Sequence, residues 1–164
     1  MSEPRRHPGD QVLARCDRLA EFSDSPDYLC RAYLTPEHRA ANDQVAQCMH
    51  ALDMTTWEDA AGNLWGRYPG LAEGPALVVG SHLDTVRNAG RFDGMLGVVV
   101  PLSALQQLHD AGQRPAQSVE VVAFADEEGT RFGTTLLGSR AVTGQWDRAW
   151  HRIKDAEGVT LEQA

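Results

Sequence analysis

The stretch VVAFADEEGTRF, residues 121–132, decides the fold and poses a problem of charge. Its apolar and β-branched residues are typical of a buried strand, and the run ends abruptly in Asp126, Glu127 and Glu128. Adjacent carboxylates repel one another, and burying an unpaired charge costs several kcal/mol, which is comparable with the whole stability of a domain. Positive charge must therefore lie close to the end of this strand.

A second apolar run shares this pattern. Residues 76–80, ALVVG, are typical of a strand buried on both faces, and they lead into His82 and Asp84. Asp93 follows at the start of an apolar helical segment. Because reactive sites of open α/β sheets lie beyond the carboxyl ends of the strands, both polar clusters are expected at one edge of the sheet.

Hydrophobic periodicity predicts an alternation of helices and strands, which indicates an α/β sandwich. The N-terminal helix is expected to be capped by Asp10, and Thr35 followed by Pro36 predicts the start of the second helix. In the third helix, Leu96 is expected to begin the buried stripe. The expected helices cover 10–22, 36–52 and 95–111, and the expected strands cover 57–59, 64–68, 76–80 and 118–125.

Composition limits the classes of function. The 164 residues have the length of one ordinary domain, and a net charge of −8 with a pI near 5.1 argues against nucleic-acid or anionic-membrane partners. No apolar run approaches the roughly 18–20 residues of a membrane span. Cys16, Cys30 and Cys48 lack metal-site spacing and predict free thiols. We therefore expect a cytoplasmic protein.

The polar residues after the two apolar runs predict a metal site. One imidazole and four carboxylates would carry too much negative charge alone, and mixed His/carboxylate ligation suits zinc, manganese or cobalt. The candidates are His82, Asp84, Asp93, Glu127 and Glu128. Taken singly, His82 is more often an ordinary hydrogen-bonded histidine, and the acidic motifs are more often a turn, a cap or a solvated loop. The five remaining histidines, His7, His38, His50, His109 and His151, are expected to be structural.

The chemistry suggests a division of roles. A carboxylate such as Asp93 can bridge two metal ions roughly 3.5–4 Å apart. A ligating imidazole usually donates its second N–H to a carboxylate, and Asp84 is placed to receive it from His82. Glu127 and Glu128 cannot point the same way in an extended segment. One of the two can bind metal while its neighbour acts as a general base.

Four motifs together resemble the dinuclear metal-dependent amidohydrolases and exopeptidases related to the aminoacylases. They are GSHLDTV (80–86), GRFDGMLGV (90–98), FADEEGTRFG (124–133) and LLGSRAVTG (136–144). The last motif, following EEGTRF, resembles the branch of allantoate amidohydrolases and N-carbamoyl-L-amino-acid hydrolases. This resemblance implies a three-layer αβα sandwich catalytic domain of the dinuclear metallo-exopeptidase type.

The resemblance also implies a role for each candidate residue. His82 would bind one metal ion, Asp93 would bridge both, and Glu128 would bind the second. Glu127 would be the general base and Asp84 the orienting partner of His82. The implied cofactors are two divalent ions per subunit, zinc or manganese, with cobalt or nickel as possible replacements.

The implied reaction is hydrolysis of a linear ureido C–N bond in a small ureido acid. The motif VRNAGRFDGMLGV (86–98) favours conversion of allantoate to ureidoglycine, ammonia and carbon dioxide in purine breakdown. An N-carbamoyl-L-amino-acid hydrolase, or a β-ureidopropionase-like enzyme, is the alternative.

The sequence departs from the family pattern in its length. Thr160–Gln163 matches a capping box, the signature of a helix start, and the sequence ends at Ala164. Family enzymes carry two further histidine ligands downstream and a second domain that dimerises and closes over the substrate. We expect residues 1–164 to be the N-terminal portion of the catalytic domain of a homodimeric enzyme. The alternative is a non-catalytic fragment that lacks these histidines.

Overall fold

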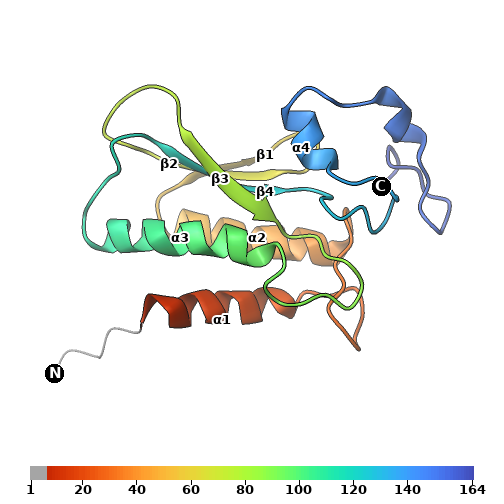
Figure 1. The fold of residues 1–164 in the computed structure, drawn as a ribbon, viewed down its shortest axis with the longest axis horizontal. Coiled ribbons are helices and arrows are strands. Elements are labelled where there is room, and N and C mark those ends of the chain that lie inside the picture. The colour runs from red at the N-terminus through yellow and green to blue at the C-terminus, as the bar shows by residue number, and fades with distance from the viewer. Residues whose placement is uncertain (1–6) are drawn as a thin grey trace.

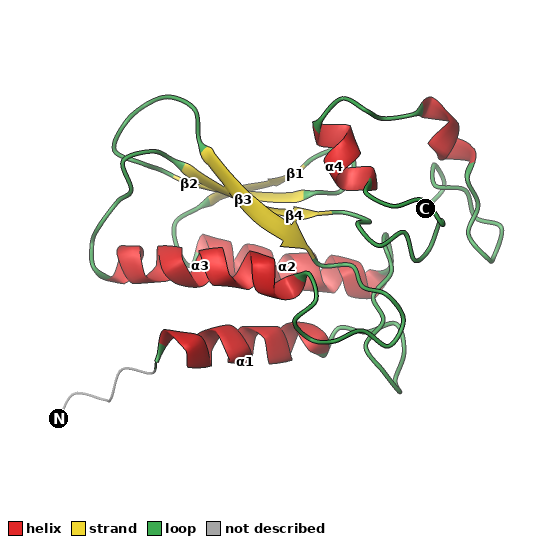
Figure 2. Ribbon diagram, in the orientation of Figure 1, coloured by secondary structure: helices red, strands yellow, loops and turns green. Residues whose placement is uncertain are grey.

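The computed structural model describes residues 7–164, in which a four-stranded sheet carries three long helices on one side (Figures 1 and 2). The α/β class expected from the sequence is confirmed. The helices are α1 (Pro8–Ala20), α2 (Pro36–His50), α3 (Met95–Asp110) and α4 (Leu137–Val142), with a 3₁₀ helix η1 (Arg148–Arg152). The strands are β1 (Thr55–Glu58), β2 (Leu64–Tyr68), β3 (Leu77–His82) and β4 (Val119–Phe124).

The strand order β1-β2-β4-β3 places the two apolar runs side by side. β3 and β4 are parallel, whereas β2 pairs antiparallel with both β1 and β4. A parallel pair needs a crossover connection, and α3 supplies it. His82 lies opposite Phe124 in this register, so the chain leaves both strands at the same edge of the sheet. The site expected from the two polar clusters lies at this edge.

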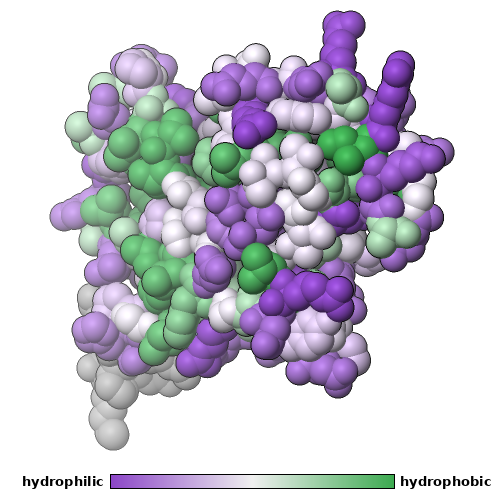
Figure 3. All heavy atoms as spheres, turned by 45° about the vertical axis from the view of Figure 1, so that its right-hand side comes forward, coloured by the Kyte–Doolittle hydropathy of each residue, from purple (hydrophilic) through white to green (hydrophobic). Residues whose placement is uncertain are grey.

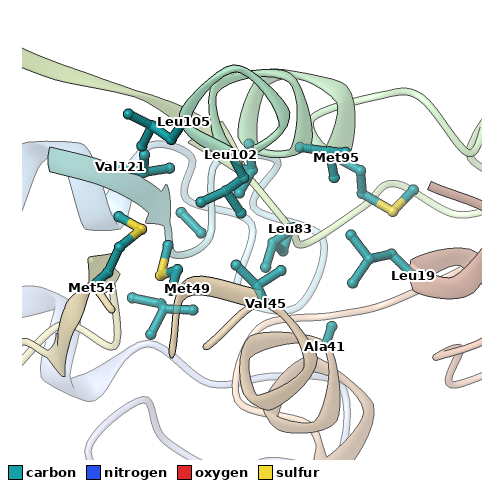
Figure 4. Packing of buried hydrophobic residues seen from close by; sticks show 14 of the residues in the cluster. Leu19, Ala41, Val45, Met49, Met54, Leu83, Met95, Leu102, Leu105 and Val121 are labelled. Carbon is teal, nitrogen blue, oxygen red and sulfur yellow. The ribbon is translucent and has the colours of Figure 1, made fainter. Parts of the chain in front are cut away.

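The main core lies between the sheet and the helices. Helices α2 and α3 cover one face of the sheet, and α1 packs beneath them (Figure 1). The start of α2 is as expected, because the Thr35 hydroxyl accepts a hydrogen bond from the N–H of His38 (3.2 Å) and Pro36 occupies the first turn. Figure 4 shows the interlocking side chains, which include Leu19, Val45, Met49, Leu83, Met95, Leu102, Leu105 and Val121.

The expectation that residues 76–80 form a strand buried on both faces is wrong. Leu77 is 54% exposed and Val78 is 49% exposed, because within residues 7–164 β3 is an edge strand. The other apolar run forms the inner strand β4, whose residues 121–123 are buried. Apolar patches interrupt the hydrophilic surface in Figure 3, and Leu77 and Val78 are among the exposed apolar residues.

Two local expectations are corrected, and a third is borne out in part. The His7 imidazole, and not Asp10, caps α1 by accepting a hydrogen bond from the N–H of Gly9 (3.1 Å). Leu96 is exposed, since α3 turns Met95, Val98 and Val99 into the core. Residues 161–163 form a turn, in which the Gln163 side chain accepts a hydrogen bond from the N–H of Thr160 (3.0 Å) as one half of a capping box would.

Two further expectations concern the cysteines and membrane-spanning segments. Cys16, Cys30 and Cys48 are free thiols, as predicted. No helix within residues 7–164 combines the length and the apolar character required to cross a lipid bilayer.

Candidate metal centre

Three of the predicted ligands meet at the carboxyl edge of the parallel strand pair. His82 ends β3, Asp93 lies just before α3, and Glu128 lies in the loop after β4. Each offers one ligand atom, and these atoms all lie within 4.8 Å of one another. One imidazole nitrogen and two carboxylate oxygens form a donor set that fits a divalent transition metal. The residues present therefore fit the metal that the sequence predicts.

The orientation of His82 is fixed by the backbone. Its Nδ1 lies 2.9 Å from the carbonyl oxygen of Asp84, whereas the nearest carboxylate oxygen of Asp84 is 3.7 Å away. Because a carbonyl can only accept, Nδ1 carries the proton and Nε2 is left free as a ligand atom. Asp84 is thus the partner of His82, as expected, but its main-chain oxygen and not its carboxylate receives the hydrogen bond.

The carboxylate of Asp84 instead anchors the acidic loop. Its two oxygens accept hydrogen bonds from the backbone N–H groups of Glu127 (3.1 Å) and Glu128 (3.0 Å). Asp84 is only 1% exposed. Burial raises the pKa of its carboxyl group, while these backbone hydrogen bonds oppose the rise. Asp84 therefore holds the backbone from which the side chains of both glutamates project.

The approach of Asp93 to His82 requires the glycine that follows it. Gly94 has a φ of +69°, and a Cβ atom placed there would lie 2.5 Å from Cε1 of His82. Glycine allows both this backbone conformation and the close contact. The Asp-Gly pair of the sequence motif therefore lets the start of α3 lie against the imidazole.

The two glutamates differ in their relation to this cluster. Glu128 belongs to the group of three ligands, and Glu127 Oε2 lies 3.7 Å from Nε2 of His82. The pKa of Glu128 is raised, chiefly by burial and then by the neighbouring carboxylate of Glu127, with a smaller contribution from Asp93. These carboxylates destabilise one another, and a bound cation would relieve that repulsion.

Asp126 is removed from this cluster by its backbone. Its φ of +51° turns the side chain into the interior, where it is fully buried. Neither carboxylate oxygen has a hydrogen-bond partner among the described residues. Burial, followed by the charge of Asp84, raises the pKa of Asp126 to about 8. The three adjacent acids are thus separated in space: one is buried and two face the edge of the sheet.

Sequence reasoning missed the buried polar side chains that support these loops. The amide of Asn63 accepts a hydrogen bond from the N–H of Ala125 (2.8 Å) and donates one to the carbonyl of Gly138 (3.1 Å). Arg131 ties the acidic loop to Asp155 (3.0 Å) and to the carbonyl of Tyr33 (3.0 Å). Arg31 is completely buried. Asn63 lies between two expected strands and Arg31 between two expected helices, and nothing in the local sequence signals their burial.

Among the remaining histidines, His38 is the most deeply placed. It is buried, its ring packs edge-on against Tyr33, and burial lowers its pKa to about 4. Within residues 7–164, His82 is the only histidine in the ligand cluster.

The fold and the cluster define an α/β protein with a His/carboxylate site at the carboxyl ends of parallel strands. Residues 63–157 match the profile of Peptidase family M28, which covers more than half of the chain. The chain belongs to Peptidase family M28.

Individual relatives have more specific names. The chain is 45% identical over 156 residues to Allantoate deiminase 1 of Glycine max, covering 93% of this chain and 32% of that one. It is 40% identical over 158 residues to the N-carbamoyl-L-amino acid amidohydrolase of Geobacillus stearothermophilus, covering 95% of this chain and 39% of that one.

A solved structure shows the same backbone arrangement. The crystal structure of a hydantoinase/carbamoylase family amidase from Burkholderia ambifaria superposes with a TM-score of 0.88 at 35% identity, covering 94% of this chain and 39% of that one. The resemblance to the allantoate and carbamoyl branch is confirmed. The chain spans 32% to 39% of the length of these three proteins.

Proposed function

We propose that this chain supplies metal ligands and the general base of an amidohydrolase that cleaves linear ureido C–N bonds. The convergence of His82, Asp93 and Glu128 within 4.8 Å, at the edge where β3 and β4 end, carries this proposal. The similarity to an allantoate deiminase favours allantoate as the substrate. Water would then release ureidoglycine, ammonia and carbon dioxide.

Each proposed ligand has one task. His82 would present Nε2, because its Nδ1 proton is engaged by the Asp84 carbonyl. Asp93 would use its two oxygens to bridge two divalent ions, and Glu128 would bind the second ion. Zinc or manganese suits these donors, with cobalt or nickel as possible replacements. When bound, such ions polarise a carbonyl group and neutralise the crowded carboxylates.

Glu127 is the proposed general base. Its backbone N–H is fixed by Asp84 (3.1 Å), and its carboxylate lies beside the ligand cluster without belonging to it. It would accept a proton from the attacking water and later deliver it to the departing nitrogen, so that ammonia leaves as the C–N bond breaks. Asp84 acts as a positioning residue because it touches the backbone of both glutamates.

The substrate alternative is an N-carbamoyl-L-amino acid or a β-ureido acid, which the similarity to the Geobacillus stearothermophilus amidohydrolase favours. The other alternative is a non-catalytic fragment. The family resemblance implies two further histidine ligands, and within residues 7–164 only His82 joins the cluster. We propose that the complete protein is a homodimeric cytoplasmic enzyme that supplies them.

Ammonia release tests this proposal. The 164-residue chain and any longer product of its reading frame would be loaded with manganese or zinc. Each would be offered allantoate, N-carbamoyl-L-amino acids and N-carbamoyl-β-alanine. We expect chelator-sensitive release, fastest from allantoate, in the longer product. No release from any of the three substrates by a metal-loaded longer product would contradict the proposed function.

A further inference from the structure

A buried guanidinium lies beneath the loop that carries His82. Arg31 is 0% exposed, and its Nε donates to the carbonyl of Leu83 (2.8 Å). Its Nη1 donates to the carbonyls of Leu19 (2.6 Å) and Phe22 (2.7 Å), where α1 ends. The carboxyl end of a helix carries partial negative charge and favours a cation. The side chain of Arg31 therefore joins the end of α1 to the loop after β3.

The backbone of Arg31 also forms hydrogen bonds with the same loop. The Arg31 N–H donates to the Thr85 hydroxyl (2.9 Å), and the Thr85 N–H donates to the Arg31 carbonyl (2.9 Å). Leu83 and Thr85 flank Asp84 in the sequence. Arg31 consequently fixes the residues immediately before and after the carboxylate that anchors Glu127 and Glu128.

Arg31 also supplies positive charge from within the protein. Burial lowers its pKa to about 10, so it stays charged at neutral pH, and Asp84 is the carboxylate that most favours its charged form. Arg131 is already paired with Asp155, and Arg91 is an exposed partner of Asp17. Nη2 of Arg31 has no hydrogen-bond partner among the described residues. The charge of the guanidinium is thus felt most strongly by Asp84 among the surrounding carboxylates.

We infer that Arg31 is a positioning residue of the proposed metal centre, which fixes Asp84 and through it the backbone of Glu127 and Glu128. The metal-binding consequence rests on the proposed function, whereas the positioning rests on these hydrogen bonds alone. A lysine cannot replace Arg31 fully. Its single ammonium cannot reach the Leu83 carbonyl and the end of α1 with the planar fork that arginine offers.

Amide hydrogen exchange in the metal-free 164-residue chain tests the positioning. In Arg31→Lys, protection of the Glu127 and Glu128 amides should fall about tenfold more than protection of the Val121 amide in β4, the effect of losing one charge-assisted hydrogen bond. Leu105→Ala is the matched control, because Leu105 is buried in the α3 core (Figure 4). It should lower the protection of Val121 at least as much as that of the loop amides. Equal losses at all three amides in Arg31→Lys would overturn the inference.

Cobalt titration, followed by the visible absorption of the bound ion, tests the consequence for metal. Arg31→Lys and Arg31→Met should bind cobalt about tenfold or more weakly than the wild type, and Leu105→Ala should bind as the wild type does. If the wild type binds no cobalt, the proposed metal site fails, and the exchange comparison still decides the role of Arg31. If Arg31→Met does not fold, Arg31→Lys carries both measurements.

Discussion

The loops that follow β3 and β4 meet the same charge problem in different ways. Residues 83–85, at the start of the loop after β3, are buried and hydrogen-bonded: the His82 imidazole donates to the Asp84 carbonyl, and Arg31 and Thr85 bond each other in both directions. The loop after β4 separates its acids by depth, with Asp126 turned inward and both glutamates at the edge. The first loop also holds the second, since Asp84 and the Thr85 carbonyl accept its hydrogen bonds. Residues 83–85 therefore support the acidic loop, which carries Glu127 and Glu128.

The comparison predicts the largest effect on turnover from a substitution of Glu127, which leaves residues 83–85 untouched. Glu127→Gln in an active, metal-loaded protein should cut ammonia release by roughly 10²–10⁴-fold, the usual contribution of a general base, while metal content is preserved. Turnover and metal analysis on the same preparation check this. Unchanged turnover would remove Glu127 from its proposed role.

Removing the shared support should damage both loops. Asp84→Ala leaves the backbone N–H groups of Glu127 and Glu128 without their acceptor, so the free energy of unfolding should fall by about 1–3 kcal/mol for each unpaired donor. Urea unfolding followed by circular dichroism measures this loss. Asp84→Asn keeps one acceptor oxygen and should lose less. Equal stability of all three proteins would show that Asp84 does not anchor the acidic loop.

Two glycine substitutions distinguish the effect of contact with His82 from the effect of backbone strain. Gly94→Ala and Gly112→Ala both place a side chain at positive φ, at +69° and +65°, but only the first meets the imidazole. Each should destabilise the fold by about 1 kcal/mol through strain, and Gly94→Ala should cost about 1–3 kcal/mol more. Gly94→Ala alone should also weaken cobalt binding. Equal cobalt affinity in the two variants would contradict the packing of Gly94 against His82.

The last effect concerns the buried acid and depends on pH. The folded-state pKa of Asp126 is raised to about 8, so its neutral form is favoured in the folded protein. The unfolded chain releases this proton at lower pH, and stability is therefore lost as pH rises from about 4 towards 8, by on the order of 1 kcal/mol per pH unit. Asp126→Asn should flatten this slope in the metal-free protein. A wild-type slope that survives in Asp126→Asn would assign the pH dependence to other groups.

The elements and the meeting of the ligands were predictable because they depend on local signals and on strand order. Thr35 and Pro36 start α2 locally, and two apolar runs joined by a helical crossover bring His82 and the acidic loop to one end of the sheet. Exposure of Leu77 and Val78 was not predictable, because an apolar run does not reveal whether its strand lies inside the sheet or at its edge. The sequence also cannot tell whether the carbonyl or the carboxylate of Asp84 meets His82, since that choice depends on loop geometry. Burial of Arg31 depends on contacts with α1 and the β3 loop, which are distant in sequence.

The most direct test of the metal centre is the metal content of the purified 164-residue chain. Wild type, Asp93→Ala and Glu127→Gln would be loaded with manganese or zinc, dialysed exhaustively and analysed for metal per folded chain. The proposed site predicts that the wild type and Glu127→Gln each retain at least one ion per folded chain. Asp93→Ala should lose that metal. Equal metal content in the wild type and Asp93→Ala would contradict a site built from His82, Asp93 and Glu128.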